Sequence, residues 1–288
     1  MDKKTKALLK ILPHRISERL NCAENIKSIE EIRLKRGMPL LIYLRREELL
    51  LNDEKGDILT VTNADIEEVI LNATGNSLYA YLDDIKKGFI TVEGGHRIGI
   101  CGTAVTEKNE IINIKDINAI NIRVAHEIKG VADNIIDYIY HNHQVKNTII
   151  ISPPQAGKTT LIRDVALNLS KIKMMKIVVI DERCEIGAVF RGEEQNELGL
   201  RVFVLSGYNK SQGFEHALRG LSPTVIICDE LCGEKDMRYI ENALNRGVKV
   251  VATIHGYSED DPDEKLKKLF DCVIVFKNGE FKIMEDKK

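Results

Sequence analysis

Four short runs of apolar, mostly β-branched residues occur in the second half of the chain, and polar residues follow each of them. The runs cover residues 148–151, 176–180, 225–228 and 248–252. Runs of this length and composition predict strands that are buried on both faces, as in a parallel sheet. After the first run, apolar residues recur at helical spacing from Leu161 to Leu169, which predicts a helix. Residues 147–288 are therefore expected to form an α/β domain, which closes with a hairpin predicted by Asn278-Gly279.

The first half of the chain alternates between helical and strand-like spacing, which predicts a smaller α+β domain over residues 1–130. The expected helices cover about residues 3–20, 63–72 and 77–87, and the expected strands cover 31–34, 39–44, 89–105 and 118–124. Asn63 is the predicted start of the second helix. A linker over residues 131–146, with a helix from Ala132 to His143, is expected to join the two domains.

The loop after the first apolar run carries the pattern of a phosphate-binding loop, known as a Walker A motif. Strand, loop, Gly157-Lys158-Thr159 and helix follow one another, which is the structural context that such a loop needs. Backbone N–H groups and a helix N-terminus would bind phosphates, Lys158 would reach the β- and γ-phosphates, and the Thr159 hydroxyl would bind Mg²⁺. Ser152 departs from the pattern, because glycine is usual there. The residues expected to hold ATP are Pro154, Gln155, Ala156, Gly157, Lys158, Thr159 and Thr160.

An acidic pair, Asp229-Glu230, follows the apolar run 225–228. Ligands of open α/β sheets bind at the carboxyl ends of the strands, so this pair would lie beside the phosphate-binding loop. Asp229 would bind Mg²⁺ through water, and Glu230 would orient and polarise the attacking water. The alternative is that the pair only caps a strand at the surface.

Two further apolar runs also end in polar residues. The run 176–180 leads into Asp-Glu-Arg, with Glu182 at its centre, and the run 248–252 leads into Thr-x-His, ending at His255. If all four strands are parallel, these groups converge on one edge of the sheet. His255 would then sense the γ-phosphate, or it would merely cap a strand end.

The stretch 217–230 has an Arg and a Leu, then a Pro, an apolar run and a Glu. It resembles the Walker B region of the type II/IV secretion ATPases, which drive pilus assembly, pilus retraction and protein export. Thr-x-His at 253–255 is similar to their histidine box, and Glu182 falls in the position of their acidic box. Within that superfamily the chain resembles the stage III sporulation AA family, through the Ser-Pro-Pro loop start and residues 31–34, 94–99, 179–186 and 222–230. His126 departs from that family, which tends to carry a basic residue there.

The resemblance implies a P-loop NTPase (RecA-like) fold for the C-terminal domain and roles for two arginines of the N-terminal domain, Arg97 and Arg123. Secretion ATPases carry arginines on the matching strands, and these reach the γ-phosphate of a bound nucleotide. A planar, permanently charged side chain suits the charge that develops there. The alternative is that both arginines form ordinary surface ion pairs. Glu182, Glu230 and His255 complete the expected catalytic set.

Composition narrows the classes of protein. Charged residues make up 30% of the chain but nearly cancel, to a net charge of −2, and aromatic residues make up 5%. This balance argues against a nucleic-acid-binding protein. No run of about 20 apolar residues and no signal-peptide pattern occurs, so we expect a cytoplasmic protein that reaches a membrane only through partners. The six cysteines lack paired Cys-x-x-Cys spacing, which predicts reduced thiols.

The residues and the resemblance together predict a Mg²⁺-dependent ATPase that converts ATP hydrolysis into domain motion within a homo-oligomeric ring, expected to be a hexamer. The resemblance implies that this motor powers a channel between mother cell and forespore during sporulation, with membrane proteins of the channel as partners. Three alternatives stay open: a pilus or type II export ATPase, a nucleic-acid-binding P-loop protein, and a ring that binds ATP without hydrolysing it. The missing tetra-cysteine zinc pattern and the short N-terminal region argue against the first.

Overall fold

The computed structural model describes residues 2–22, 26–45, 47–75, 81, 84, 88–277 and 279–285, without side-chain detail at 234 and 285. These residues form two compact units. Unit 1 comprises Met1–His126 together with Phe190–Gln195, and unit 2 comprises Glu127–Val189 together with Asn196–Lys288. Each unit has a hydrophobic core of its own.

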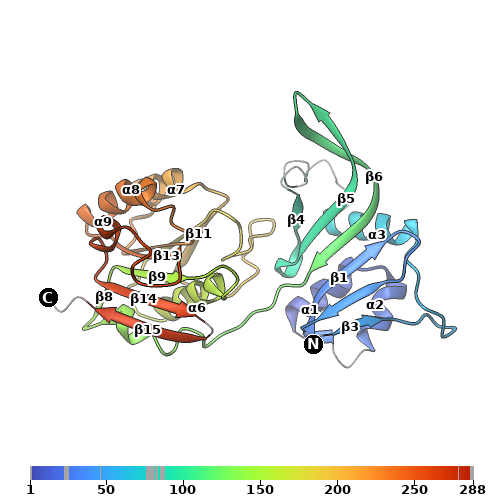
Figure 1. Ribbon diagram of the computed structural model, residues 1–288, viewed down its shortest axis with the longest axis horizontal. Coiled ribbons are helices and arrows are strands. Elements are labelled where there is room, and N and C mark those ends of the chain that lie inside the picture. The colour runs from blue at the N-terminus through green and yellow to red at the C-terminus, as the bar shows by residue number, and fades with distance from the viewer. Residues whose placement is uncertain are drawn as a thin grey trace. The chain divides into compact units, whose positions relative to one another are not determined.

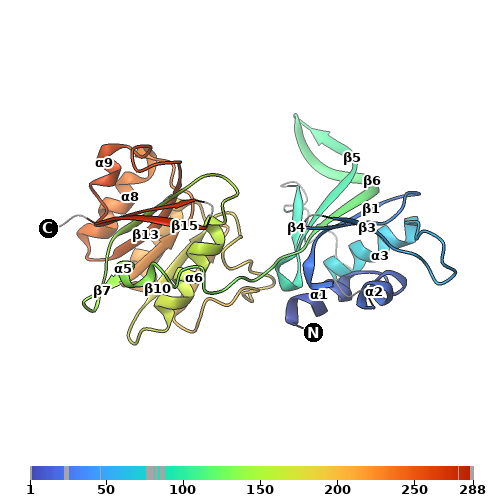
Figure 2. The ribbon, with the colours of Figure 1, turned by 60° about the horizontal axis from the view of Figure 1, so that its bottom comes forward.

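Unit 1 is an antiparallel sheet with helices packed on one face (Figures 1 and 2). Its strand order is β3-β2-β1-β6-β5-β4. Along β1, Ile32 and Leu34 are buried while Arg33 and Lys35 are exposed, so alternate side chains enter the core. The elements are α1 (Lys3–Ile11), α2 (His14–Asn21), β1 (Ile29–Lys35), β2 (Leu41–Leu44), β3 (Glu48–Leu50), α3 (Asn63–Thr74), β4 (Phe89–Thr91), β5 (Arg97–Glu107) and β6 (Glu110–Arg123).

The single helix predicted over residues 3–20 is wrong, because two helices, α1 and α2, occupy this segment. Leu12 between them is extended, with φ −83° and ψ 148°. The residue before a proline avoids the helical region, and a proline inside a helix removes a hydrogen bond. Pro13 therefore ends one helix and becomes the N-cap of the next.

Helix α3 begins at Asn63, as predicted, but Asn63 is not its cap. Thr62 is the N-cap, and its side chain and that of Asp65 form a reciprocal capping box, which satisfies two backbone N–H groups at the helix start. Arg15 of α2 also binds the Asp65 carboxylate, so the cap connects two helices. The helix predicted at 77–87 lies largely outside the described residues.

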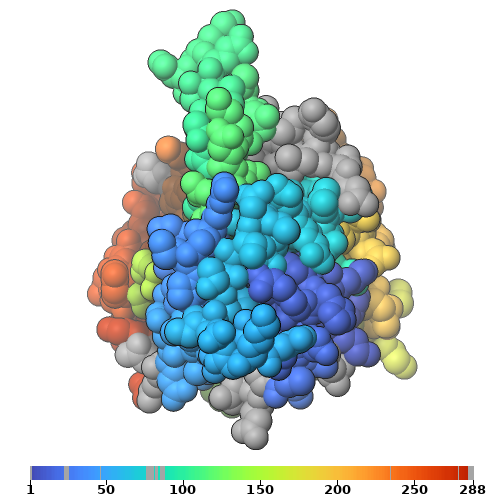
Figure 3. All heavy atoms as spheres, turned by 90° about the vertical axis from the view of Figure 1, so that its right-hand side faces the viewer, coloured from blue at the N-terminus to red at the C-terminus, as the bar shows by residue number. Residues whose placement is uncertain are grey.

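Strands β5 and β6 form a long hairpin that extends beyond the rest of its sheet. The hairpin turns at Lys108 and Asn109, which both have positive φ angles of 49° and 65°. Pairing is irregular between Cys101 and Thr103 and again near Thr106, and such bulges bend a strand pair. Figure 3 shows the hairpin, in green, standing out from the blue and cyan surface of unit 1.

Unit 2 contains a sheet with the strand order β11-β10-β12-β13-β9-β14-β15. All neighbours are parallel except β14 and β15. These last two strands form the predicted C-terminal hairpin, with Lys277 opposite Glu280; Asn278 itself lies outside the described residues. The elements that build the sheet and its covering are β9 (Thr148–Ser152), α6 (Lys158–Ser170), β10 (Ile177–Asp181), β11 (Val202–Ser206), α7 (Lys210–His216), a π-helical turn η4 (Ala217–Leu221), β12 (Val225–Cys228), α8 (Glu234–Asn245), β13 (Lys249–His255), α9 (Glu264–Lys267), β14 (Cys272–Lys277) and β15 (Glu280–Glu285).

Helices cover both faces of this parallel sheet, as Figure 1 shows. Leu161 and Val165 of α6 pack with Val179 of β10 on one face. Phe214 of α7 and Ile240 of α8 belong to the cluster on the other face. Burial on both faces explains why the strands are continuous apolar runs without alternation. No helix in the described part of the chain has the length and apolarity needed to cross a bilayer.

The helix predicted from Ala132 to His143 is wrong over most of its length. Only Ile136–Ile139 (α5) is helical, and a short hairpin of β7 (Tyr140–His141) and β8 (Gln144–Val145) follows it. Asn142 and His143 make the turn with positive φ angles of 49° and 63°. Ile135 and Ile139 are both buried in the core of unit 2, and the single helical turn of α5 is enough to bury them, so the helix need not continue to His143.

Candidate nucleotide-binding and hydrolysis site

The loop between β9 and α6 has the backbone of a phosphate cradle. Gly157 is the N-cap of α6, with φ 91° and ψ 17°. A Cβ atom at Gly157 would lie 3.8 Å from Phe276, an ordinary contact, so its left-handed backbone is what favours glycine. The residues predicted to hold the nucleotide, from Pro154 to Thr160, lie in this loop and in the first turn of α6. Backbone N–H groups at a helix start suit an anion.

Ser152 fits at the start of this loop because it is still part of the sheet. It is the last residue of β9, it is fully buried, and it lies opposite His255 of β13 in parallel register. The glycine that is usual at this position is therefore not required by the backbone here.

Thr159 and Asp229, the two residues predicted to bind Mg²⁺, contact each other directly. The Thr159 hydroxyl donates to Asp229 Oδ2 over 2.9 Å, which brings α6 to the end of β12. The Thr253 hydroxyl donates to the other carboxylate oxygen of Asp229, and Thr253 Oγ1 accepts the backbone N–H of Glu230 at 2.9 Å. A hydroxyl next to a carboxylate is a donor set that suits Mg²⁺, which commonly binds one or two protein ligands and substrate phosphates.

Three basic side chains surround the carboxylate of Glu230. Arg183 NH2 lies 2.6 Å from Oε2, while Lys158 Nζ and His255 Nε2 lie 3.5 and 3.3 Å from Oε1. Lys158 is 5% exposed, and its ammonium is also 3.1 Å from His255 Nε2. The lysine expected to bind phosphate and the carboxylate expected to polarise water are thus partners of each other. Glu230 itself has a left-handed backbone, with φ 53°, an arrangement that tends to cluster at functional sites.

The two acidic residues at the end of β10, Asp181 and Glu182, have different hydrogen-bond partners. Asp181 accepts the backbone N–H groups of Glu185, Ile186 and Gly187 at 2.8 to 3.0 Å, so it shapes the following loop. Burial raises the pKa of Asp181, and these N–H groups oppose that shift. Glu182 instead lies 2.6 Å from the Lys210 ammonium at the start of α7. Burial alone lowers the pKa of Lys210, but the Glu182 carboxylate holds it above its ordinary value.

The two arginines of the first domain are neighbours on adjacent strands of unit 1. Arg97 of β5 lies directly opposite Arg123 of β6. The Arg97 guanidinium stands 4.5 Å from the centre of the Phe89 ring, a cation–π contact. Arg123 lines a hollow of about 480 Å³ together with Glu31, Arg33 and other residues. Contact of either arginine with a nucleotide remains a prediction.

Two residues of the cluster were not among the sequence-predicted site residues. Arg183 lies just after β10, and Thr253 lies near the end of β13. Their positions at the carboxyl ends of these strands were the only signal in the sequence that could have pointed to them. The strand pattern identifies the edge, but it does not identify which polar residue of each strand end reaches Glu230. Thr253 is fully buried and satisfies two neighbours at once, which marks it as a positioning group.

The sequence profile of one protein family, described as "Sporulation stage III, protein AA", matches residues 1–281. The chain belongs to this family. Stage III sporulation protein AA of Bacillus subtilis (strain 168) is 35% identical over 237 residues, which cover 81% of this chain and 75% of the relative. Protein SEEDLING PLASTID DEVELOPMENT 1 of Arabidopsis thaliana is 25% identical over 256 residues, and these are 88% of this chain but 34% of the plant protein.

Solved structures with a similar fold include a pilus retraction motor and an ATPase. The pilus retraction motor PilT, solved with bound ADP, superposes with a TM-score of 0.62 at 16% identity, covering 98% of this chain and 83% of PilT. The Legionella pneumophila ATPase DotB gives a TM-score of 0.55 at 16% identity, covering 93% and 77%. The predicted fold class, a P-loop NTPase (RecA-like) fold with a smaller α+β N-terminal domain, is confirmed.

Proposed function

We propose that this chain binds ATP with Mg²⁺ and hydrolyses it. The observation that supports this most strongly is the meeting of Lys158, Thr159, Asp229 and Glu230 at the carboxyl ends of neighbouring parallel strands. Each of these groups has the chemistry that phosphoryl transfer requires: a cation for the phosphates, a donor set for the metal, and a carboxylate for water. They come from two separate segments of the sequence, 158–159 and 229–230.

Each residue has a distinct role in the proposed reaction. The N–H groups of residues 155–160 bind the phosphates, and Lys158 leaves Glu230 to contact the β- and γ-phosphates. Thr159 and Asp229 hold Mg²⁺, which neutralises phosphate charge when bound. Glu230, once relieved of Lys158, orients the attacking water and accepts its proton. His255 stands beside both Lys158 and Glu230 and is suited to respond to the γ-phosphate.

The further proposal concerns the use of this energy. Membership of the sporulation AA family and the fold shared with PilT and DotB support a motor that converts ATP hydrolysis into domain motion. We place this motor in a homo-oligomeric ring, expected to be a hexamer, that powers a channel between mother cell and forespore through membrane-protein partners. Pilus or type II export is the alternative use of the same motor, and a nucleic-acid partner is a further alternative.

The test is ATP turnover measured with particle mass, with and without Mg²⁺. Lys158→Ala removes the phosphate-binding ammonium and should lower turnover by about 100-fold or more. Because Lys158 also neutralises Glu230, the variant should melt a few degrees lower but remain folded. Lys171→Ala is the matched control, because Lys171 lies at the other end of α6, where its ammonium donates to Asn168 Oδ1 over 2.7 Å. Wild-type turnover in Lys158→Ala would remove the phosphate-binding loop from the mechanism.

One observation favours a second candidate function, a ring that binds ATP without turnover. Both oxygens of the Glu230 carboxylate already contact basic side chains, which compete with water for the same lone pairs. If this pairing persists with ATP bound, the chain would bind nucleotide and stay inactive. Release of inorganic phosphate under single-turnover conditions separates the two functions, because binding alone releases none.

A further inference from the structure

One short segment of the chain belongs to a different unit from the residues on either side of it. Phe190–Gln195 lies between β10 and β11 of unit 2 in the sequence, but it is part of unit 1. The chain therefore passes from one unit to the other three times, after His126, after Val189 and after Gln195. We call residues 184–197, which contain this segment, the crossing loop.

The base of the crossing loop is held by side chains of unit 2. Arg163 of α6 donates from Nε to the Ile186 carbonyl over 3.1 Å and from NH2 to the Glu185 carbonyl over 2.9 Å. Asp181 accepts three backbone N–H groups of the same stretch. Because donors and acceptors of this backbone are both bound, the base is fixed to β10 and α6. Helix α6 begins at Lys158, the residue expected to bind phosphate.

The tip of the crossing loop is a tight turn packed within unit 1. Phe190 and Glu193 exchange two backbone hydrogen bonds of 2.9 and 3.0 Å. Arg191 and Gly192 between them have positive φ angles of 49° and 82°, a pattern typical of a two-residue hairpin. A Cβ atom added to Gly75, the C-cap residue of α3, would lie 2.4 Å from the Arg191 guanidinium. The tip therefore packs closely on a helix of unit 1.

Gln195 joins this tip to the turn that precedes β5. Its Oε1 accepts the Gly94 N–H over 2.8 Å, and its Nε2 donates to the Glu193 carbonyl over 2.9 Å. Gln195 is 8% exposed, and Gly94 is buried with φ 83°. A Cβ atom at Gly94 would lie 2.9 Å from the Ala7 Cβ, so glycine is required there. A buried N–H that loses its acceptor is costly, and the Gln195 carboxamide therefore holds this turn in place.

The turn held by Gln195 leads directly into Arg97. Residues Glu93–Gly95 form the 3₁₀ turn η3. The Val92 N–H donates to the His96 carbonyl over 2.9 Å and closes the turn. Strand β5 then begins at Arg97. A side chain from the second half of the sequence thus holds the segment that carries one of the two arginines predicted to contact the γ-phosphate.

We propose that the crossing loop is a brace that positions Arg97 for the proposed reaction, and that Gln195 is its positioning residue. The base of the brace is bound to α6, which carries Lys158, and its tip is bound to the turn before β5. Misplacing a group that acts on the reacting atoms by about 1 Å lowers rates by about 100-fold, so a fixed connection of this kind has a kinetic consequence. That consequence rests on the proposed hydrolysis, whereas the brace itself is a property of the folded chain.

The first experiment measures amide hydrogen exchange of the full chain without nucleotide. Gln195→Met keeps the size of the side chain but removes the acceptor, so exchange in residues 93–97 should become about tenfold faster or more. Arg163→Gln weakens the base of the brace, and it should make exchange in the same residues about threefold faster or more. An unchanged rate in Gln195→Met would overturn the role of Gln195.

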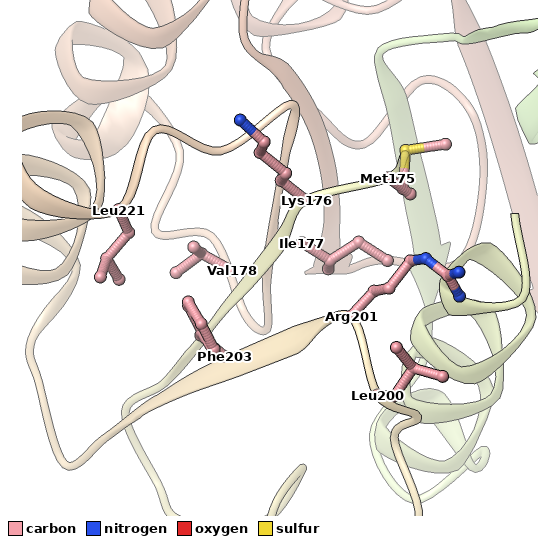
Figure 4. Close-up of a pocket in the computed structure, with 8 residues that line it drawn as sticks. All are labelled: Met175, Lys176, Ile177, Val178, Leu200, Arg201, Phe203 and Leu221. Atoms are coloured by element: carbon pink, nitrogen blue, oxygen red, sulfur yellow. The ribbon is translucent and has the colours of Figure 1, made fainter. Parts of the chain in front are cut away.

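Arg201→Gln is the matched control for Arg163→Gln. Arg201 NH1 also donates to a backbone carbonyl of unit 2, that of Ser170, over 2.9 Å. Figure 4 shows Arg201 beside a hollow at the amino ends of β10 and β11, whereas Arg183 follows the carboxyl end of β10. Exchange in residues 93–97 should keep the wild-type rate in this control. A wild-type rate in Arg163→Gln, or an equal increase in both variants, would overturn the brace, whether or not the chain hydrolyses ATP.

The second experiment measures ATP turnover with Mg²⁺. Gln195→Met should lower kcat by about tenfold and leave KM and ADP affinity nearly unchanged, because the lost bond acts through Arg97. Gln195→Glu keeps an acceptor for the Gly94 N–H and should recover most of the turnover. Gln144→Met, at an exposed position of β8, is the control. Faster exchange with unchanged kcat in Gln195→Met would make Gln195 a purely structural residue and overturn its positioning role.

The third experiment combines Gln195→Met with Arg97→Ala. If Gln195 acts through Arg97, the double variant should lose no more turnover than Arg97→Ala alone. Losses that multiply would give Gln195 a separate effect and overturn the proposal. A wild-type chain that hydrolyses no ATP would remove the proposed function instead, and the exchange experiment would then decide the brace by itself.

Discussion

Arg183 and Glu230 form an ion pair in which the guanidinium nitrogen lies 2.6 Å from Glu230 Oε2. The pair joins the loop after β10 to the residue after β12, two neighbouring parallel strands. Arginine binds a carboxylate strongly and in a fixed orientation. Since the same oxygen would have to accept a hydrogen bond from water during hydrolysis, Arg183 restrains the proposed general base.

The first prediction concerns Arg183→Ala. The substitution releases Glu230 Oε2 toward water, so turnover at saturating ATP should rise severalfold, while affinity for ADP stays nearly constant. Arg183→Lys keeps the positive charge but donates from a single nitrogen, so its turnover should lie between those of Arg183→Ala and the wild type. Steady-state turnover and ADP titration on the same preparations provide the check. A comparable decrease in turnover would instead make Arg183 part of the hydrolytic machinery.

The second prediction compares Glu230→Gln with Glu182→Gln. Glu230→Gln keeps size and hydrogen bonding but removes the charge that polarises water, so hydrolysis should fall by about 100-fold or more while ATP still binds. Glu182→Gln should be milder, because the partner of Glu182 is Lys210 on α7. Turnover and nucleotide affinity of both variants decide the roles. If Glu182→Gln is the more severe change, the assignments of the two carboxylates are reversed.

The third prediction concerns Arg97 and Arg123. If they contact the γ-phosphate, Arg97→Ala or Arg123→Ala should lower turnover by about tenfold or more and leave ADP affinity nearly unchanged. Arg97→Ala also removes a cation–π contact with Phe89, so its melting temperature should drop slightly. Arg33→Ala provides a control on the neighbouring strand β1. Unchanged turnover in both single variants and in the double variant would leave unit 1 without a part in hydrolysis.

The fourth prediction concerns the pH dependence of stability. His96 is fully buried; its Nδ1 accepts the Ala125 N–H at 3.0 Å, and its Nε2 lies 2.9 Å from the Lys4 carbonyl oxygen. Burial lowers the pKa of His96 to about 4, whereas the unfolded side chain titrates near its ordinary value of 6.5. The unfolded chain therefore takes up the proton first, and stability that is present above pH 6.5 is lost as pH falls toward 4.

The expected loss from His96 across that range is about 3 kcal/mol, from the linkage between protonation and unfolding. This loss of stability is measured by urea unfolding at several pH values between 7.5 and 4, followed by signals that come from unit 1. His96→Gln should show a smaller decrease with falling pH than the wild type, and the exposed His141, changed to Gln, should leave the slope as it is. Parallel pH profiles for wild type and His96→Gln would contradict the prediction.

Features that depend on local pattern were predictable from the sequence. The buried parallel strands are apolar runs because both faces are covered, and the loop at Gly157 follows from the backbone that phosphate binding requires. Because these strands all run in the same direction, the strand ends that carry Asp229 and His255 lie at one edge of the sheet. The sequence therefore identifies which residues meet at this edge, while their roles in nucleotide binding and hydrolysis stay predictions.

Features that depend on contacts between distant parts of the chain were not predictable from local sequence patterns. The segment around Ile135 and Ile139 has helical spacing, but burial of these side chains is compatible with a hairpin turning at Asn142 and His143. Similarly, the sequence around Glu182 and Arg183 does not indicate that Arg183 pairs with Glu230 while Glu182 pairs with Lys210. Partner choice among charged residues depends on which strand ends become neighbours, and that is decided by the whole sheet.

The left-handed backbone of Glu230, with φ 53°, has a consequence for how this position can evolve. A side chain in that conformation costs about 1 kcal/mol relative to glycine, so drift toward stability alone would replace the glutamate. If Glu230 polarises water as proposed, this position sets the stability of the fold against hydrolysis. Glu230→Gly would then give a more stable chain that no longer hydrolyses ATP.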